Sequence, residues 1–181
     1  KVMLRLHIDA LIVPSTDPHQ SEYLPSFWKC REWLTGFTGS AGVAVVTQSQ
    51  ALFWTDSRYF IQAEIELNPP FQLVKQVTRN PEFIDWINTN LDFGKNVGID
   101  GQLVSHVMFN QMLKTFATKQ IKVSLVGDLF HQNWEDRPLL PDGKIFEHEV
   151  DIAGESRKQK IEKLITLLNL NKAGYLIIST L

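Results

Sequence analysis

Apolar and polar positions change their spacing several times along the chain, and each spacing predicts an element. Two short runs, 43–46 and most of 51–54, are apolar throughout, which is typical of paired strands buried on both faces. Lys75 interrupts the alternation of 71–77, so this strand is expected near a sheet edge. The ranges expected to form strands are 10–13, 43–47, 51–55, 71–77, 97–100, 121–125 and 175–179.

Helical spacing separates most of these strands. In the clearest case Ile161, Leu164, Ile165 and Leu168 recur at i, i+3, i+4 and i+7. The ranges expected to be helical are the start of the chain up to residue 6, part of 21–33, 57–67, 81–91, 105–118 and 155–171. Strands and helices therefore alternate, which predicts an α/β fold with a mixed β-sheet and helices on both faces.

Two polar residues are expected to cap these helices. Asp56 is a good N-cap for 57–67, and Asn80 precedes a proline, Pro81, that would occupy the first helical position. This placement puts Arg58 in the first turn of a helix, where a cation opposes the positive end of the helix dipole.

The residues from 135 onward differ in composition from those before them. Prolines 138 and 141 and the pair Asp142-Gly143 predict an exposed linker over 135–144. The helix and strand that follow cannot bury their own apolar faces. We therefore expect one domain over 1–145 and the truncated start of a second, similar domain over 146–181. The chain also begins without Met, as a trimmed chain would.

Composition excludes several classes of protein. Of 181 residues 44% are hydrophobic, which indicates a globular core. The net charge is −2 and no Lys/Arg block occurs, so neither nucleic acid nor a membrane surface is an expected partner. No apolar run approaches the roughly 20 residues that span a bilayer. Cys30 stands alone, which excludes an internal disulfide and favours a reducing compartment, so we expect a cytoplasmic protein.

Candidate catalytic and metal sites are weak. The histidines are scattered, no H-E-x-x-H occurs, and one Cys cannot form a thiolate metal site. The cluster Asp17, His19, Ser21 and Glu22 resembles a hydrolytic set, but catalytic triads are built from separate segments, so a turn is favoured. Cys30 has aromatic and basic neighbours, yet a small structural role is favoured over a reactive thiol.

Two features near the paired strands stand out. The repeat Gly36-x-x-Gly39-x-x-Gly42 lacks the features of a phosphate-binding loop and precedes a strand, so it predicts a sharply bent or closely approached backbone. Arg58 leaves two interpretations open. It either forms an ordinary salt bridge or faces an anion or another ligand.

Four motifs occur in order and together resemble a known family. They are Asp17-x-His19-x-Ser21-Glu22-Tyr23, Gly36-Phe-x-Gly39-Ser-Ala-Gly42, Trp54-Thr-Asp56-x-Arg58-Tyr-Phe60 and Trp134-x-Asp136-Arg137-Pro138. This set is similar to the creatinase/prolidase N-terminal domain family, as found in long, three-domain Xaa-Pro aminopeptidases (aminopeptidase P). The resemblance covers about 1–145, and 146–181 is similar to the start of the middle domain.

The resemblance implies a fold with a ribonuclease H-like motif and a role in a larger enzyme. Such enzymes remove the N-terminal residue that precedes proline in a peptide, using two divalent metal ions, commonly manganese. The metal ligands and catalytic residues belong to a C-terminal "pita-bread" domain that is absent from this sequence. No residue of the chain is therefore expected to be catalytic or to bind metal, and the chain alone is expected to be inactive. A homodimer is expected for the whole protein.

One site residue follows from the resemblance. The family's substrate-binding Arg corresponds to Arg58, with Asp56 holding the turn and Tyr59, Phe60 and Trp54 anchoring it. Close relatives more often have Gly at position 57, where this chain has Ser57, which leaves Arg58 unaffected. Two alternatives remain open: a prolidase, which cleaves dipeptides only, and a non-catalytic peptidase-like binding module.

Overall fold

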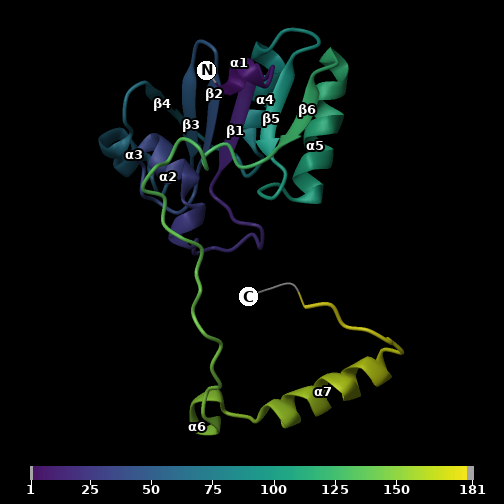
Figure 1. Ribbon diagram of the computed structural model, residues 1–181. Coiled ribbons are helices and arrows are strands. Elements are labelled where there is room, and N and C mark those ends of the chain that lie inside the picture. The colour runs from purple at the N-terminus through teal and green to yellow at the C-terminus, as the bar shows by residue number, and fades with distance from the viewer. Residues whose placement is uncertain (1, 179–181) are drawn as a thin grey trace. The chain divides into compact units, whose positions relative to one another are not determined.

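The computed structural model describes residues 2–178, which divide into two compact units, one up to residue 140 and one from residue 141 (Figure 1). The first unit contains the sheet and most of the helices. The second contains two helices joined by irregular chain. The domain boundary expected between residues 145 and 146 stays a prediction.

The first unit is built on one mixed sheet of six strands in the order β4-β3-β2-β1-β5-β6. β2 is antiparallel to both of its neighbours, while all other pairs of neighbours are parallel. The predicted α/β class and mixed sheet are confirmed, and β4 is an edge strand as expected. The strands are β1 (Ala10–Pro14), β2 (Val43–Thr47), β3 (Ala51–Thr55), β4 (Phe71–Lys75), β5 (Asn96–Asp100) and β6 (Lys122–Val126).

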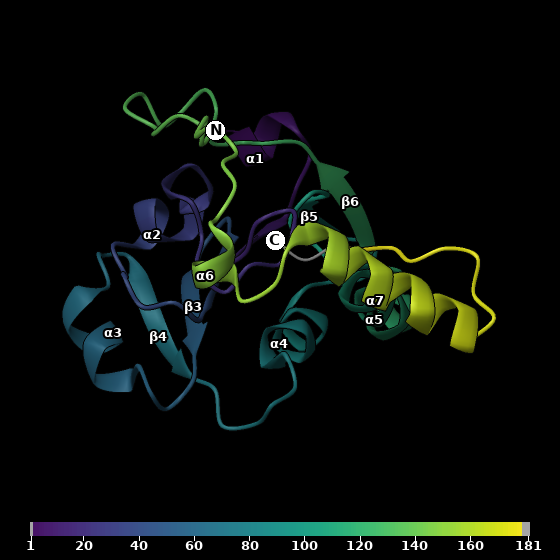
Figure 2. The same ribbon diagram turned by 90° about the horizontal axis from the view of Figure 1, so that it is seen from below.

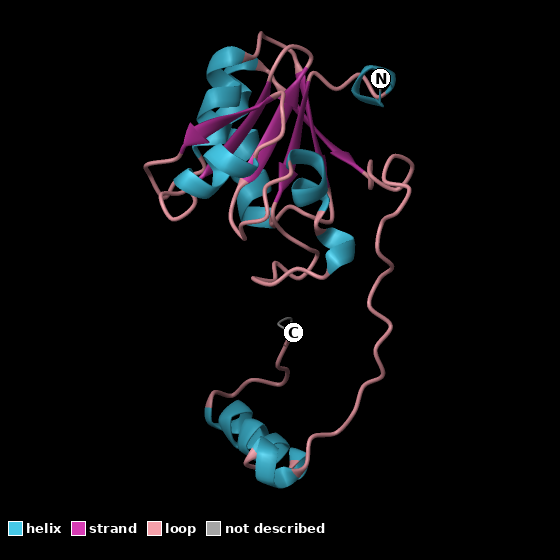
Figure 3. Ribbon diagram, turned by 90° about the vertical axis from the view of Figure 1, so that its left-hand side faces the viewer, coloured by secondary structure: helices cyan, strands magenta, loops and turns pink. Residues whose placement is uncertain are grey.

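Helices cover both faces of the sheet (Figures 2 and 3). α4 and α5 lie on one face, and α2 and α3 lie on the other, as the view from below in Figure 2 shows. The helices of this unit are α1 (Val2–Arg5), η1 (Ser26–Trp28), α2 (Cys30–Thr35), α3 (Phe60–Glu66), α4 (Glu82–Asn90), α5 (His106–Phe116) and η2 (Ala117–Lys119).

Two hydrophobic clusters fill the space between the sheet and these helices. The alternation of β3 shows the division, because Leu52 and Trp54 belong to one cluster and Phe53 to the other. Ile87 of α4 joins the first cluster, and Ala63 of α3 joins the second. Every residue of β3 is buried, as its apolar run predicts.

The parallel strands end at one edge of the sheet, which we call the carboxyl edge. β1, β3, β4, β5 and β6 all end there, and β2 begins there because it is antiparallel. The connecting segments 15–29, 36–42, 56–59 and 127–140 therefore meet this edge. In open α/β sheets this is where ligands bind. The carboxyl edge is the place to look for a site.

Two predicted helix starts are wrong. The helix expected over 57–67 begins at Phe60, with Tyr59 and not Asp56 at its N-cap position. The helix expected to begin at Pro81 begins one residue later, so Pro81 and not Asn80 occupies the N-cap. In the first case the Asp56 side chain bonds to the turn before the helix, which delays the first helical residue.

The second unit contains α6 (Val150–Ala153) and α7 (Arg157–Leu170). α7 confirms the helix expected there, and Ser156 and Gln159 form a capping box at its start. Residues 175–178 form no strand, so that prediction is wrong, and residue 179 lies outside the described residues. A strand needs a hydrogen-bonding neighbour, and residues 141–178 contain none. Among residues 2–178, every helix is too short or too polar to cross a membrane.

Candidate functional site

Arg58, the one site residue expected from the sequence, lies at the carboxyl edge, on the turn between β3 and α3. Its Nε and Nη2 donate to the Asp56 carboxylate, to Oδ1 and Oδ2 respectively, both at 2.8 Å. The backbone N–H of Arg58 also donates to Asp56 Oδ1, at 3.1 Å. Asp56 therefore closes the turn and holds the guanidinium in a two-point contact. This is the salt bridge of the first interpretation, and Arg58 precedes the helix instead of opposing its dipole.

The ion pair changes both pKa values but leaves Arg58 open to solvent. The hydrogen bond and charge of Arg58 hold the pKa of the Asp56 carboxyl below its usual value, and Asp56 raises the pKa of Arg58. The Arg58 side chain is 67% exposed, against 35% for Asp56. A guanidinium has five N–H donors, so this exposed group can bind a second acceptor without leaving Asp56.

Tyr59 contacts the Arg58 guanidinium through its ring and connects it to the glycine loop, residues 36–42. The Arg58 guanidinium lies 5.2 Å from the centre of the Tyr59 ring, within the range of a cation–π contact. The Tyr59 hydroxyl shares a 2.8 Å hydrogen bond with Ser40, and its ring meets Phe37 edge to face. Tyr59 therefore anchors Arg58 as expected. Trp54 packs in the cluster on the other face of the sheet, against Trp86, and its anchoring role stays a prediction.

The glycine loop follows a path that side chains would obstruct, as its sequence predicts. Gly36 ends α2 with φ +78°, in the left-handed region. A Cβ on Gly42 would lie 2.3 Å from the Phe53 ring and 2.9 Å from the Trp54 carbonyl oxygen. The loop can therefore pack directly on β3.

Sequence reasoning missed the residue that holds this loop, Arg31 of α2. Its side chain is buried and donates to the carbonyl oxygens of Phe37 and Gly39, and to the Ser15 hydroxyl at 2.8 Å. Ser15 in turn donates to the Gly42 carbonyl at 2.7 Å. Burial lowers the pKa of Arg31 to about 10, so the group stays charged at neutral pH. In the sequence it was only one more charge in Lys29-Cys-Arg-Glu32, without a signal of burial.

The acidic cluster 17–23 forms the turn that the sequence favours. The buried Asp17 carboxylate accepts backbone N–H bonds from His19 at 2.9 Å and Ser21 at 3.0 Å. Burial raises the pKa of Asp17, but these hydrogen bonds outweigh it and leave the pKa below its usual value. Across residues 2–178, no three His, Cys, Asp or Glu side chains come together as metal ligands would.

The linker expected over 135–144 is exposed except at Arg137, which is half-buried, and Trp134 just before it is buried. The Arg137 guanidinium lies 3.7 Å from the centre of the Phe27 ring, and its Nε donates to the Phe27 carbonyl at 2.9 Å. It also forms an ion pair with Asp128 and lies 3.4 Å from the Cys30 sulfur. Burial raises the pKa of the Cys30 thiol to about 11, with Arg137 acting in the opposite direction. Cys30 is therefore the small structural residue that was favoured.

Known proteins with similar sequences share this architecture. The Creatinase/Prolidase N-terminal domain family matches residues 1–129. Aminopeptidase P1 of Arabidopsis thaliana is 38% identical over 175 residues, which is 96% of this chain and 27% of the relative. A probable Xaa-Pro aminopeptidase P of Coccidioides posadasii is 36% identical over 186 residues, covering the whole chain and 30% of the relative.

A solved structure gives the same result. The X-prolyl aminopeptidase of Caenorhabditis elegans, described as a cytosolic enzyme with a di-nuclear active site, superimposes with a TM-score of 0.81 at 32% identity. The match covers 91% of this chain and 27% of that enzyme. The chain thus spans less than a third of the length of each of these three relatives. With its mixed sheet, its four motifs and this match, the chain belongs to the creatinase/prolidase N-terminal domain family.

Proposed function

We propose that this chain is the N-terminal, non-catalytic part of a metal-dependent Xaa-Pro aminopeptidase and that Arg58 binds the peptide substrate. The exposed guanidinium of Arg58, fixed from one side by Asp56 and Tyr59, is the observation that carries the proposal. A positioned arginine with free N–H donors suits a carbonyl or carboxylate of a peptide.

The rest of the enzyme would supply the chemistry. We propose that residues 146–181 begin a second domain, and that a C-terminal domain binds two divalent metal ions, manganese being our expectation. The di-nuclear site described for the Caenorhabditis elegans enzyme supports two metals. That enzyme is also described as cytosolic, which supports a cytoplasmic location here. We further propose a homodimer of the whole protein, which sedimentation of the full-length protein would test.

The experiment that tests Arg58 uses the full-length protein, an Xaa-Pro-Pro peptide and added manganese. Arg58→Ala should raise KM about 10- to 100-fold with a smaller change in kcat, since it removes a charge-assisted contact worth roughly 1.5–3 kcal/mol. Arg157→Ala is the matched control, because Arg157 is also exposed and pairs with a carboxylate, Glu147, at 3.0 Å. An unchanged KM in Arg58→Ala would restrict Arg58 to its salt bridge.

Two further measurements separate the alternatives. A prolidase would cleave the Xaa-Pro dipeptide in preference to the tripeptide, whereas an aminopeptidase requires a longer peptide. The relatives that match the chain at 36–38% identity are named as aminopeptidases, which supports that interpretation. A binding module would cleave neither peptide with metal present. The purified 181-residue chain should be inactive in every case.

A further inference from the structure

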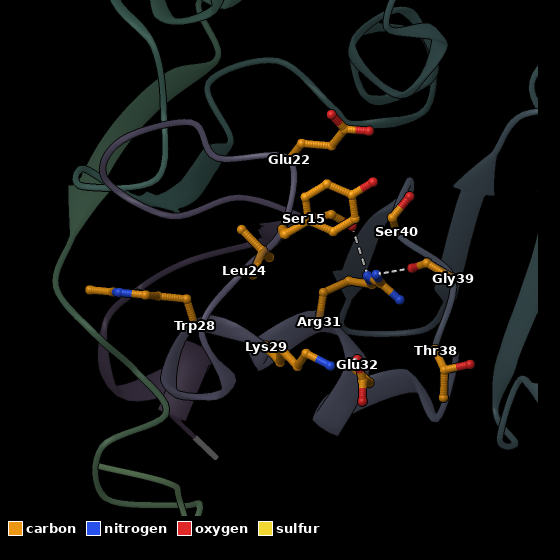
Figure 4. A pocket seen from close by; sticks show the side chains of 11 residues that line it. Ser15, Glu22, Leu24, Trp28, Lys29, Arg31, Glu32, Thr38, Gly39 and Ser40 are labelled. Carbon is orange, nitrogen blue, oxygen red and sulfur yellow. Dashed lines mark hydrogen bonds and ion pairs between the residues drawn. The ribbon is translucent and has the colours of Figure 1, made fainter. Parts of the chain in front are cut away.

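A pocket of about 220 Å³ opens beside the glycine loop, and Arg58 is not among the residues that line it. Residues from three segments line it: the chain after β1, helix α2 and the glycine loop (Figure 4). Those that matter below are Glu22, Leu24, Trp28, Arg31, Gly39 and Ser40. This volume is below the usual range for drug-sized ligands, so a ligand here would be small.

Arg31 provides a buried positive charge on the wall of this pocket. Only 4% of Arg31 is exposed, yet within residues 2–178 it belongs to no ion pair. Buried charges in proteins are normally paired with an opposite charge. Figure 4 shows the Arg31 side chain between Leu24 and Lys29 on one side and Gly39 and Ser40 on the other. Within residues 2–178 no carboxylate therefore contacts Arg31 directly, and a pocket meets its side chain.

The hydrogen bonds of Arg31 leave room for a ligand. Of the five N–H groups of a guanidinium, one donates to Ser15, one to Phe37 and one to Gly39. Each Nη therefore keeps one N–H that these bonds do not use, and a charged guanidinium N–H is a strong donor to a carboxylate.

Two carboxylates, Glu32 and Glu66, act on Arg31 through their charge, which raises its pKa against the effect of burial, but neither forms an ion pair with it. Glu32 forms its own ion pair with Lys29 at 3.2 Å. Glu22 is exposed, where solvent screens its charge. Leu24 and Trp28, which are partly buried, supply an apolar wall for the body of a ligand.

We propose that this pocket binds a small organic carboxylate with an apolar body, whose carboxylate accepts a hydrogen bond from an N–H group that Arg31 leaves unused. Free apolar amino acids and the C-terminal residues of peptides carry this chemistry. The inference does not depend on Arg58 or on peptidase activity, and it can be tested on the 181-residue chain.

The test is an NMR titration of the isotope-labelled chain at constant ionic strength with benzoate, with benzamide and with inorganic phosphate. Benzamide has the shape of benzoate without the charge. Benzoate should give saturable shifts of the Gly39 and Ser40 amides and of the Trp28 indole, and it should bind at least tenfold more tightly than benzamide or phosphate. Equal binding of benzoate and benzamide, or of benzoate and phosphate, would overturn the carboxylate assignment.

Variants locate the site and guard against a folding defect. Leu24→Trp fills the pocket without removing a bond of Arg31, and it should abolish the benzoate shifts. Leu139→Trp is the control, since Leu139 is 90% exposed and lies outside the pocket, and it should leave them unchanged. Arg31→Lys keeps the charge but loses the planar guanidinium and its N–H donors, and it should weaken benzoate binding at least tenfold. Full binding in Leu24→Trp would show that benzoate binds elsewhere.

Discussion

At the scale of single residues, two arginines perform different work within one edge of the sheet. Arg58 is exposed and paired with a carboxylate, whereas Arg31 is buried and bonded to carbonyl and hydroxyl oxygens. The sequence drew attention to Arg58 because its neighbours form a family motif. Arg31 carries no such signal, since its burial depends on how the glycine loop folds over α2.

The Asp56–Arg58 pair predicts a pH dependence with a definite sign. The pKa of Asp56 is lowered in the folded chain, so the pair stabilises the fold above the usual pKa of an aspartate, about 3.9, and loses this contribution as the pH falls through the folded pKa. NMR titration should find the Asp56 midpoint below the usual value, and Arg58→Ala should move it upward. An unchanged midpoint in the variant would show that the turn, and not Arg58, sets this pKa.

At the scale of elements, the strands of the sheet were predictable from the sequence, but the residues at which α3 and α4 begin were not. Apolar runs located β2 and β3 with the correct bounds, because a strand buried on both faces has few alternative interpretations. The start of α3 was missed because Asp56 bonds to the N–H of Arg58 in a turn, an arrangement that uses the same residue type as an N-cap. The same ambiguity affected the candidate site, because Arg58 lies in that turn and was expected in the first turn of the helix.

The packing of the glycine loop on β3 predicts a large effect from a small substitution. Gly42→Ala would place a Cβ 2.3 Å from the Phe53 ring and 2.9 Å from a backbone oxygen, so β2 or β3 must shift. We expect a loss of about 1–3 kcal/mol in the free energy of unfolding, measured with urea. Gly143→Ala is the matched control, because no atom lies within 4 Å of its added Cβ. Equal stability of the two variants would contradict this packing.

The segment from β6 to residue 137 shows what composition could not reveal. The linker predicted over 135–144 is exposed apart from Arg137, but Trp134 just before it is 9% exposed, stacks on Trp33 at 5.4 Å and belongs to the core. Arg137 is fixed beside it by Asp128 and Phe27. Only tertiary contacts reveal that aromatic residues flanking a polar stretch are part of the fold.

These contacts predict a change in proteolysis. Arg137→Ala removes the ion pair with Asp128 and the contact with the Phe27 ring, which frees 128–137 to leave the surface. Chymotrypsin should then cut after Phe130 or Trp134 at least tenfold faster than in the unmodified chain. Arg157→Ala removes an exposed ion pair instead and should not change this rate. Slow cutting in both variants would mean that packing of the aromatic residues suffices.

At the scale of the whole molecule, the described residues form a sheet unit and a short helical unit. The exposed apolar residues of α7 and of the stretch after it, among them Ile161, Ile165 and Ile177, show that the second unit buries little of its own apolar surface. The second domain expected from the sequence stays a prediction. The first unit needs none of it, because both of its hydrophobic clusters are built from residues before 140.

Two truncations follow from this division. Residues 1–140 should unfold with a free energy within about 0.5 kcal/mol of the full chain, because the removed residues form their own unit. Residues 1–127 lack Phe130, Trp134 and Arg137, so they should lose at least about 3 kcal/mol, the usual cost of removing a large buried aromatic side chain. Urea unfolding measures both. If both truncations lost equal stability, residues 141–181 would have to stabilise the first unit. Removal of Phe130, Trp134 and Arg137 would then cost nothing further, and Trp134 would not mark the end of the core of the first unit.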